Sequence, residues 1–597
     1  IEESPRYYAQ LTYIFFLPTK HLYEYHQEIE NLKKDDGKYD TEQCYKLIEK
    51  KFIKKYVSKI YGGDLEKEEA AETENLNRFD FQFLDAIRDA EKEMFFGSHS
   101  LLKDVVNYFL DYDITDGYDF EELTQKQKDE IKEKEGEFKC KSKDLLWHLK
   151  NRISKEKMLE YAEETGADIG GSPDFDAEIS EQEMLFALRL IVEKNGLKLP
   201  IKNNGLGYNN LLFIALILAR IQMIRSSSMG DNAKIFPMMA IEEPEAHLHP
   251  SMQAKFLEFL ERNLNEHRQA RQVFITSHST HITSAVDLDS IICLYEDVNG
   301  CNKAGYPGKV FTNEKKDEDS KNYIKRFLDA TKSNMLFANK LIFVEGVSEQ
   351  ILLPCFAAYL NKEEQLLNEH ICIVNIDSRT FKHFLKIFQY DLDQNPYAIN
   401  RKVACITDAD PMKKRINSGR SNQFVKCYPY ELNEDIKNFK YRPLATHAQE
   451  LQKISDDYEN IEVYTSPVGE GKTLEYELAM NNPSCKSLIT DCFPSSGKNS
   501  KSIFYNVMEA YDNEKSLEDL IELSNHEDII SLINNSDWQE SEKRKALIAS
   551  MYYDAVENLK GTHAFYLEKQ LRDNFEDNKL TFKVPDYIKN AIEYITI

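Results

Sequence analysis

Short apolar runs that end in acidic residues recur in the second half of the chain and predict buried strands. Three of them are KLIFVEG (residues 340–346), ICIVNID (371–377) and VACITDAD (403–410). Stretches with a helical spacing of apolar residues separate these runs. Apolar strands that alternate with helices are typical of a parallel sheet with helices on both faces. We therefore expect an α/β domain that begins near residues 332–339.

The first half of the chain shows a different pattern. The run TYIFFL (12–17) predicts a strand, whereas much of residues 41–193 has charged faces with few Gly or Pro and predicts helices. Two charged segments in it, 66–74 and 126–144, are read as solvated helix faces, with a helical arm for dimerisation as the alternative. A Gly/Asn turn, an apolar helix, a strand, a helix and another strand then form a second α/β pattern, which ends near Ile292.

Composition narrows the class of protein. A chain of 597 residues is long enough for two or three domains. Its net charge of −26 argues against coating of nucleic acid through bulk charge but leaves room for a local basic groove. The ten cysteines form no CxxC pair, which fits a reducing cytoplasm. The longest apolar run (211–219) is too short to span a bilayer, no signal peptide is visible, and we expect no membrane partner.

Acidic residues stand where two of the predicted strands end. Asp408 and Asp410 are two residues apart at the end of one strand, and Glu345 ends another. Gly346 permits a tight turn, and Glu349 lies in the first turn of the helix that follows. Because the carboxyl ends of parallel strands open on one edge of a sheet, these acids can converge there. Hard oxygen ligands suit Mg²⁺, so the order of motifs predicts a metal site, although an isolated DxD would be read as a solvated turn.

A second group of chemically suitable residues precedes this one. The segment PMMAIEEPEAHLHP (237–250) is an apolar strand that ends in Glu242 and Glu243, and the strand QVFITSH (272–278) ends in His278. Nucleotide hydrolysis needs an acid for the water shell of Mg²⁺ and a base that orients the attacking water. Glu242 and Glu243 suit these two roles, and His278 is placed to reach a γ-phosphate.

This arrangement resembles the ATP-binding-cassette (ABC) ATPases of the repair and structural-maintenance type. Glu242 and Glu243 match their Walker B motif, 244–249 the D-loop, and His278 the switch histidine. The segment NNGLGYNNLLFIALIL (203–218) resembles their signature segment, which implies that ATP binds Gly205, Gly207 and Asn209 from a facing protomer. Such ATPases act as paired heads, so the resemblance implies a homodimer or a higher homo-oligomer.

The resemblance has two departures. Glu242 stands where most of these ATPases have Asp, and no G-x-x-x-x-G-K-[ST] motif precedes Walker B. The segment SPVGEGKT (466–473) resembles such a phosphate loop, but Ser466 replaces its first Gly and the segment follows Walker B. The chain also begins with Ile1 inside a predicted strand. We therefore expect the Walker A part of the ATPase domain to lie in missing N-terminal sequence.

Later segments identify a family. Glu345 followed by a DxD motif is the Toprim pattern. The segments KTLEYELA (472–479), LKGTHAFYLEKQL (559–571) and FKVPDYIKNAIEYI (582–595) accompany it. Together they resemble the OLD (overcoming lysogenization defect) family of nucleases, in which an ABC-type ATPase is fused to a C-terminal Toprim nuclease. The resemblance implies an ATPase domain over 1–335 with a helical dimerisation insert at about 85–195, and a Toprim domain over 336–597.

The family also implies a mechanism, two-metal phosphodiester cleavage. Two Mg²⁺ ions, with Mn²⁺ as an alternative, would be held by Glu345, Glu349, Asp408 and Asp410. Further candidates come from later in the chain: Glu475 and Glu477 as second-metal or outer-shell ligands, and Lys560 as the lysine that stabilises transition-state charge. A surface lysine before a helix is the alternative for Lys560. Ser378 is read as a helix cap rather than a metal ligand.

The substrate and partners are expectations of the same kind. The loop DPMKKRINSGR (410–420) places four cations just past the metal site, which predicts contacts to a DNA backbone, with a solvated loop as the alternative; they are Lys413, Lys414, Arg415 and Arg420. The family suggests an ATP-regulated DNA endonuclease, similar to Gabija-type or retron-associated anti-phage nucleases. A second defence-system protein, or a retron reverse transcriptase with its msDNA, would then be a partner. The rival interpretation is a nucleotide-sensing ATPase scaffold that binds DNA or a protein without cutting.

Overall fold

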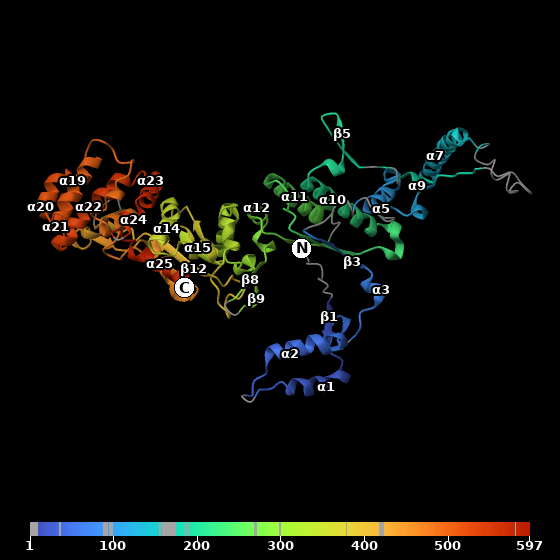
Figure 1. The fold of residues 1–597 in the computed structure, drawn as a ribbon, viewed down its shortest axis with the longest axis horizontal. Coiled ribbons are helices and arrows are strands. Elements are labelled where there is room, and N and C mark those ends of the chain that lie inside the picture. Colours follow the sequence, from blue (N-terminus) through green and yellow to red (C-terminus); the bar gives the residue numbers. More distant parts are fainter. Residues whose placement is uncertain are drawn as a thin grey trace, which may run out of the picture. The chain divides into compact units, whose positions relative to one another are not determined.

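The computed structural model describes residues 10–34, 37–67, 69–86, 94, 100–154, 157, 175–185, 188, 190–267, 271–297, 300–377, 379–416, 423–579 and 581–597. The chain divides into two compact units, Ile1–Ser277 and His278–Ile597, and each is described by itself (Figure 1). The division falls before the boundary predicted at residue 335.

A three-stranded parallel sheet lies at the centre of the first unit. Its strands are β3 (Phe79–Leu84), β6 (Phe236–Glu242) and β7 (Gln272–Thr276), in the order β3-β6-β7. Alternate residues of β6 are buried, and its Met239 and Ile241 pack with apolar residues of α10 (Leu206–Arg225) and α11 (Pro250–Arg262). The predicted strand-helix-strand pattern around Glu242 is therefore present.

The apolar helix α10 is longer than the apolar run that predicted it. By length and composition it is long enough to cross a membrane, but half of its most apolar window is buried. Phe213, Ile214 and Ile221 lie in the same cluster as Met239 of β6. This helix is therefore a core element of the first unit.

The helical prediction for residues 41–193 holds only in part. Strands β2 (Val57–Gly62) and β3 lie inside this region, and β2 pairs antiparallel with β1 (Leu11–Phe16), close to the strand predicted at 12–17. The segment 66–74 holds part of a short 3-10 turn and only the start of α3 (Thr73–Leu76). In β3, FDFQFL alternates apolar and polar residues, a period of two that indicates a strand.

The charged run at 126–144 does form a long helix. Helix α7 (Gln125–Arg152) begins at Thr124, whose backbone N–H donates to the Gln127 side chain (3.0 Å), and only Ile131 and Ser142 in it are buried. The remaining described helices and strands of this unit are α1 (Thr19–Glu30), α2 (Thr41–Leu47), α3 (Thr73–Leu76), α5 (Leu101–Tyr108), α6 (Tyr112–Thr115), α9 (Glu181–Leu185), β4 (Ile191–Lys194) and β5 (Leu197–Pro200).

The second unit is built around the predicted parallel sheet. Its strands are β10 (Lys340–Val344), β11 (Ile371–Asn375), β12 (Lys402–Thr407) and β16 (Ile461–Thr465), in the order β11-β10-β12-β16. All neighbouring strands are parallel. The predicted fold class is confirmed in this unit.

Helices cover both faces of this sheet, which explains why its strands are continuously apolar. Ile342, Val344, Ala404 and Ile406 pack into one hydrophobic cluster, whereas the intervening Leu341, Phe343, Val403 and Cys405 pack into another. The first cluster includes residues of α14 (Val347–Tyr359), α22 (Glu540–Val556) and α25 (Asp586–Thr596); the second includes residues of α13 (Lys315–Phe327), α16 (Phe381–Leu385) and α17 (Thr446–Asp457).

A small antiparallel sheet and a helical region complete the unit. The small sheet has the order β14-β13-β15, with β13 (Met412–Arg415), β14 (Val425–Lys426) and β15 (Phe439–Arg442). Helices α19 to α22 form the orange-red group in Figure 1. The remaining elements are α12 (Thr280–Ala285), β8 (Cys293–Glu296), β9 (Asn302–Gly305), α15 (Glu363–Asn368), α18 (Leu474–Asn481), α19 (Lys501–Asp512), α20 (Leu517–Ser524), α21 (Glu527–Asn535), α23 (Lys560–Asp573) and α24 (Phe575–Asn578).

Candidate active site

Glu345 lies at the carboxyl edge of the parallel sheet. Strands β10 and β12 run in register, with Val344 opposite Ile406, so the residues that follow them meet at one edge. Oε1 of Glu345 accepts a hydrogen bond from the backbone N–H of Asp408 (3.2 Å) and another from the hydroxyl of Thr407. The structure thus brings the end of the first Toprim motif onto the second, as the sequence predicted.

A histidine that no motif indicated also holds Glu345. Nε2 of His447, in the first turn of α17, lies 2.9 Å from Oε1 of Glu345 and 3.1 Å from Oγ1 of Thr407. Burial acts to raise the pKa of Glu345, but the hydrogen bonds from His447 and Thr407 outweigh it and hold that pKa below its ordinary value. His447 therefore favours the carboxylate form of Glu345 and fixes its orientation.

The two aspartates of the DxD motif have different partners. Oδ1 of Asp408 accepts from the backbone N–H of Leu474 (3.0 Å), the first residue of α18. This contact explains the TLE segment, because the start of its helix binds the motif. Asp410 is 1% exposed, has a positive φ of 43°, and pairs with Arg379, while Lys426 Nζ lies 3.5 Å from its Oδ1. Arg379 follows β11 and, like His447, was not predicted.

Glu349 and Asp408 are buried beside other acids. Oε2 of Glu349 accepts from the backbone N–H of Gly346 (3.2 Å), so Glu349 turns back over the start of α14 toward Glu345. Burial, followed by repulsion from Glu475, raises the pKa of Glu349 to about 7. Burial, followed by repulsion from Glu345, raises the pKa of Asp408 well above its ordinary value. These carboxyl groups therefore lie near enough to one another for their charges to repel.

Lys560 lies among these carboxylates. Its Nζ donates to Oε2 of Glu475 (2.8 Å). Although burial acts to lower it, the nearby carboxylates of Glu475 and Asp408 raise the pKa of Lys560, so the amine stays charged. Gly561 permits this approach of α23, because a Cβ there would meet Val347 of α14 at 3.0 Å.

Glu477 does not join the group. Its Oε1 faces Gly471, where an added Cβ would stand 2.8 Å away, and burial raises the pKa of Glu477 to about 8. Tyr587, from the terminal VPDYI segment, is buried near these acids and Glu477: burial, followed by the charges of Asp408 and Glu477, raises the pKa of its phenol well above the ordinary value. The motif at the chain's end therefore packs against the acidic group.

The donor set fits a divalent cation. Oδ1 of Asp410 and Oε1 of Glu475 are buried and accept no hydrogen bond. Each carboxylate is nevertheless paired, Asp410 with Arg379 and Lys426, and Glu475 with Lys560. A buried oxygen that accepts no hydrogen bond is still costly, and a divalent cation would relieve that cost. As the side chains stand, no three His, Cys, Asp or Glu residues in the described part of the chain are arranged to hold a metal ion. Arg379, His447 and Lys560 bind the carboxylates instead.

The basic residues after the DxD motif do not form the predicted loop. Met412–Arg415 is strand β13, and its Lys413 pairs with the buried Glu431, so Lys413 is less available to a phosphate than expected. Lys414 lies over the ring of Phe424 (5.7 Å), and Arg415 is exposed. Arg420 and Ser378 lie outside the described residues.

The segment that imitates a phosphate loop has a structural role. Lys472 is 2% exposed and donates to the backbone carbonyl of Cys427 (2.9 Å), between the rings of Tyr428 and Tyr553. The Lys472 carbonyl accepts from the backbone N–H of Asp410 (3.1 Å). This segment therefore supports the DxD turn.

In the first unit, the signature segment packs directly on the D-loop. A Cβ on Gly207 would stand 2.3 Å from the His247 carbonyl oxygen, so only glycine fits at this approach. Gly205, Gly207 and His247 line an open hollow of about 410 Å³ at the start of α10. Asn209 is buried and donates to the carbonyl of Ile201 (3.2 Å), which gives it a structural role.

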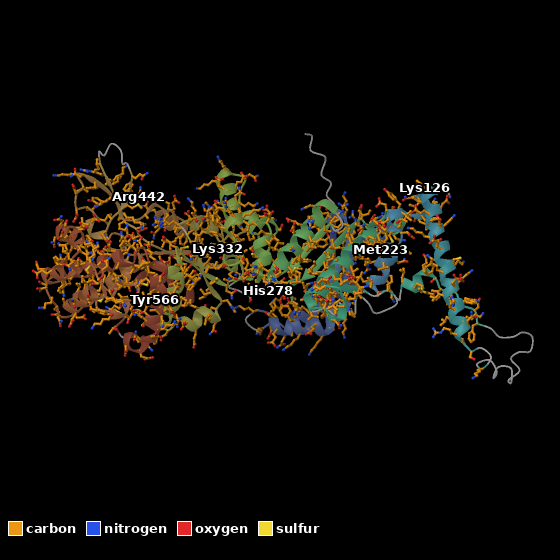
Figure 2. All side chains as sticks on the ribbon, turned by 90° about the horizontal axis from the view of Figure 1, so that it is seen from above. Lys126, Met223, His278, Lys332, Arg442 and Tyr566 are labelled. Atoms are coloured by element: carbon orange, nitrogen blue, oxygen red, sulfur yellow. The ribbon has the colours of Figure 1, made fainter. Side chains whose placement is uncertain are left out.

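The paired acids stand at the end of β6. Oε2 of Glu242 accepts from the backbone N–H of Ala86 (3.4 Å), just past β3, and Glu243 has a positive φ of 39°. A strained backbone of this kind is frequent at functional sites. His278, labelled in Figure 2, begins the second unit, two residues after β7 ends.

Two known families match the chain. Residues 2–283 match the family described as AAA ATPase domain, and residues 336–410 match the family described as Overcoming lysogenization defect protein-like, TOPRIM domain. Both occur in the order that the motifs predicted.

Individual relatives match over shorter parts. Endonuclease GajA of Bacillus cereus (strain HuB5-5) is 28% identical over 213 residues, 31% of this chain and 29% of the relative. The uncharacterized protein MJECL43 of Methanocaldococcus jannaschii is 29% identical over 142 residues, 24% of this chain and 34% of its own. The chain thus spans about a third of these curated relatives. The C-terminal region of the Burkholderia pseudomallei OLD protein covers 44% of this chain and 98% of its own, with 15% identity and a TM-score of 0.23. The predicted recognition is confirmed at the level of the two domains: residues 2–283 are similar to an AAA ATPase domain, and residues 336–410 are similar to a Toprim domain of the OLD type.

Proposed function

We propose that this protein is an ATP-regulated, divalent-metal-dependent DNA nuclease that hydrolyses phosphodiester bonds at the Toprim edge. The observation that carries the proposal is the convergence of Glu345, Glu349, Asp408 and Glu475 with the charged Lys560 at one sheet edge. A structural ion pair needs one acid for one lysine. Several buried acids around a single lysine therefore favour a functional site.

The residues divide into ligands and supporting groups. Glu345, Glu349, Asp408 and Asp410 would hold two Mg²⁺ or Mn²⁺ ions, with Glu475 beside them and Glu477 as a more remote candidate. When bound, such ions activate water and neutralise charge on the scissile phosphate. Lys560 carries a positive charge to the same place. Other groups hydrogen-bond to the ligands and orient them: His447 and Thr407 hold Glu345, and the backbone N–H of Leu474 holds Asp408.

The ATPase part of the chain, residues 2–283, would regulate the nuclease through ATP. Glu242, Glu243 and His278 would serve hydrolysis. Gly205 and Gly207, which line the hollow at the start of α10, would contact nucleotide on a second copy, whereas the buried Asn209 would support them. A homodimer is supported by α7, where Leu145 and Leu149 are one turn apart and both are more than half exposed. By analogy with the relatives, we propose a cytoplasmic role in anti-phage defence, with DNA as substrate and a second defence protein or a retron product as partner.

Supercoiled plasmid cleavage, with and without Mg²⁺ and ATP, tests the proposal. We expect wild type to cut only with the metal, at a rate that ATP changes, and Asp408→Asn to be inactive. Asp377→Asn is the matched control, because Asp377 follows β11 of the same sheet but pairs with Lys332 (3.2 Å). If wild type does not cleave plasmid with either Mg²⁺ or Mn²⁺, the scaffold interpretation is favoured. If Asp408→Asn and Asp377→Asn cleave equally, the assignment of Asp408 to the metal site is wrong.

A further inference from the structure

The small antiparallel sheet that follows the DxD motif has two chemically different faces. In an antiparallel pair, directly opposite residues lie on the same face, and residues two apart along a strand do too. Met412 is opposite both Lys426 and Arg442, and Lys414 is opposite Lys440. One face therefore carries four cations, Lys414, Lys426, Lys440 and Arg442, which we call the basic face.

The other face carries two cations, of which one is paired with an acid. It carries Lys413, Arg415, Phe439 and Tyr441. Lys413 pairs with Glu431 and lies 5.5 Å from the ring centre of Phe439. Arg415 is the remaining cation on this face, at the end of β13. Two of the four cations that the sequence assigned to DNA thus point away from the basic face.

On the basic face, an aromatic ring rather than an acid lies against Lys414 and Arg442. The ring of Phe424, just before β14, lies 4.3 Å from the Arg442 guanidinium and 5.7 Å from Lys414 Nζ. Among the described residues, no carboxylate pairs with Lys414 or Lys440. Like charges directly opposite each other destabilise a sheet, so the pairing of Lys414 with Lys440 costs stability in the free protein. A polyanion would remove this cost.

The basic face adjoins the acidic group at two points. Lys426 lies 3.5 Å from Asp410, and Arg442, labelled in Figure 2, donates to Thr446, the residue before His447. Phosphates bound on this face would therefore lie beside the carboxylates that we assign to the metals. In a chain with a net charge of −26, such a local cationic surface is needed to hold DNA there.

We propose that the basic face binds the phosphate backbone of the DNA whose scissile bond enters the Toprim site, a proposal that rests on the proposed nuclease function. Backbone contacts of this kind give affinity without sequence preference. Each lost contact lowers the slope of log affinity against log salt by about 0.9 on duplex DNA. Lys414→Gln/Lys440→Gln should therefore lower the slope by about 1.8.

The test measures fluorescence anisotropy of a labelled duplex of mixed sequence, with Ca²⁺ in place of Mg²⁺, between about 50 and 200 mM salt. Arg415→Gln is the matched control, because it removes one charge from the next residue on the opposite face. We expect a single Lys414→Gln to weaken binding at low salt by several-fold more than Arg415→Gln. Equal slopes for wild type, the double variant and Arg415→Gln would overturn the proposal.

The variant Lys440→Glu tests whether a loss of DNA binding could result from misfolding. It places a carboxylate opposite Lys414, which should maintain or raise the melting temperature while it weakens DNA binding. Unchanged affinity in this variant would also overturn the proposal. Plasmid cleavage by the same proteins separates the two hypotheses. If the proteins cut plasmid and the salt slopes of the variants are unchanged, only the DNA-binding role of the basic face is rejected. If the slopes are lower but no protein cuts plasmid, only the proposed nuclease function is rejected.

Discussion

Replacing His447 with alanine removes the only ring nitrogen in the described site that bonds to Glu345 (2.9 Å). Groups that orient a metal ligand contribute 10- to 100-fold to metal affinity or activity, or about 1.4–2.7 kcal/mol. The Thr407 hydroxyl still donates to the same carboxylate oxygen, so part of the orientation survives. We therefore expect the lower end, about a tenfold rise in the Mg²⁺ concentration for half-maximal cleavage.

Two further variants make this measurement specific. His383→Ala removes a comparable ring that stacks on Tyr323 and bonds to Ser320 (2.9 Å), away from the acids, and should leave the Mg²⁺ dependence unchanged. His447→Gln retains a hydrogen-bond donor, so its Mg²⁺ concentration for half-maximal cleavage should lie between those of His447→Ala and wild type. A folded His447→Ala protein with the Mg²⁺ dependence of wild type would refute the orienting role.

Three further predictions concern single side chains. Lys560→Met should slow cleavage by about 100-fold with little change in DNA affinity, because one charge beside the reacting phosphate is lost; Lys569→Met, exposed on the same helix, should cut like wild type. Glu243→Gln should stop ATP turnover in a phosphate-release assay yet permit nucleotide-bound dimers by light scattering; continued turnover would reject Glu243 as the base. Burial lowers the pKa of His563 to about 4, so the unfolded chain binds its proton first as pH falls. The contribution of His563 to stability should therefore be full above about pH 6.5 and fall by about 3 kcal/mol toward pH 4, and the difference between wild type and His563→Gln in denaturant titrations should show this slope.

The parallel sheet and the first acids could be predicted because local sequence determines them. Strands buried on both faces are apolar throughout, and Glu345 and Asp408 each follow such a strand directly. The sequence names Glu475 and Glu477 as equal candidates, and only the structure shows that Glu475 is the one beside Lys560. Residues two apart on a helix point to nearly opposite sides, so only one of them can face the acids.

The supporting residues could not be predicted because long-range contacts place them. Arg379 and His447 lie 31 and 102 residues from the carboxylates that they bind, Asp410 and Glu345, and neither belongs to a motif. The sequence predicts a loop for the basic segment, because its strand neighbours, β14 and β15, follow it in the chain and supply the pairing. The register of β13 with β14 and β15 alone decides which cations of the basic segment share a face with cations of the other two strands.

Calorimetric titration of Mn²⁺ into the purified protein tests the central claim most directly, because it needs neither DNA nor ATP. If the acids at the carboxyl edge of the sheet form the metal centre, wild type and Asp377→Asn should bind Mn²⁺ with the same affinity and stoichiometry. Asp408→Asn should lose binding at this centre, since one of its buried carboxylates becomes an amide. Identical titrations of wild type and a folded Asp408→Asn protein would contradict the account.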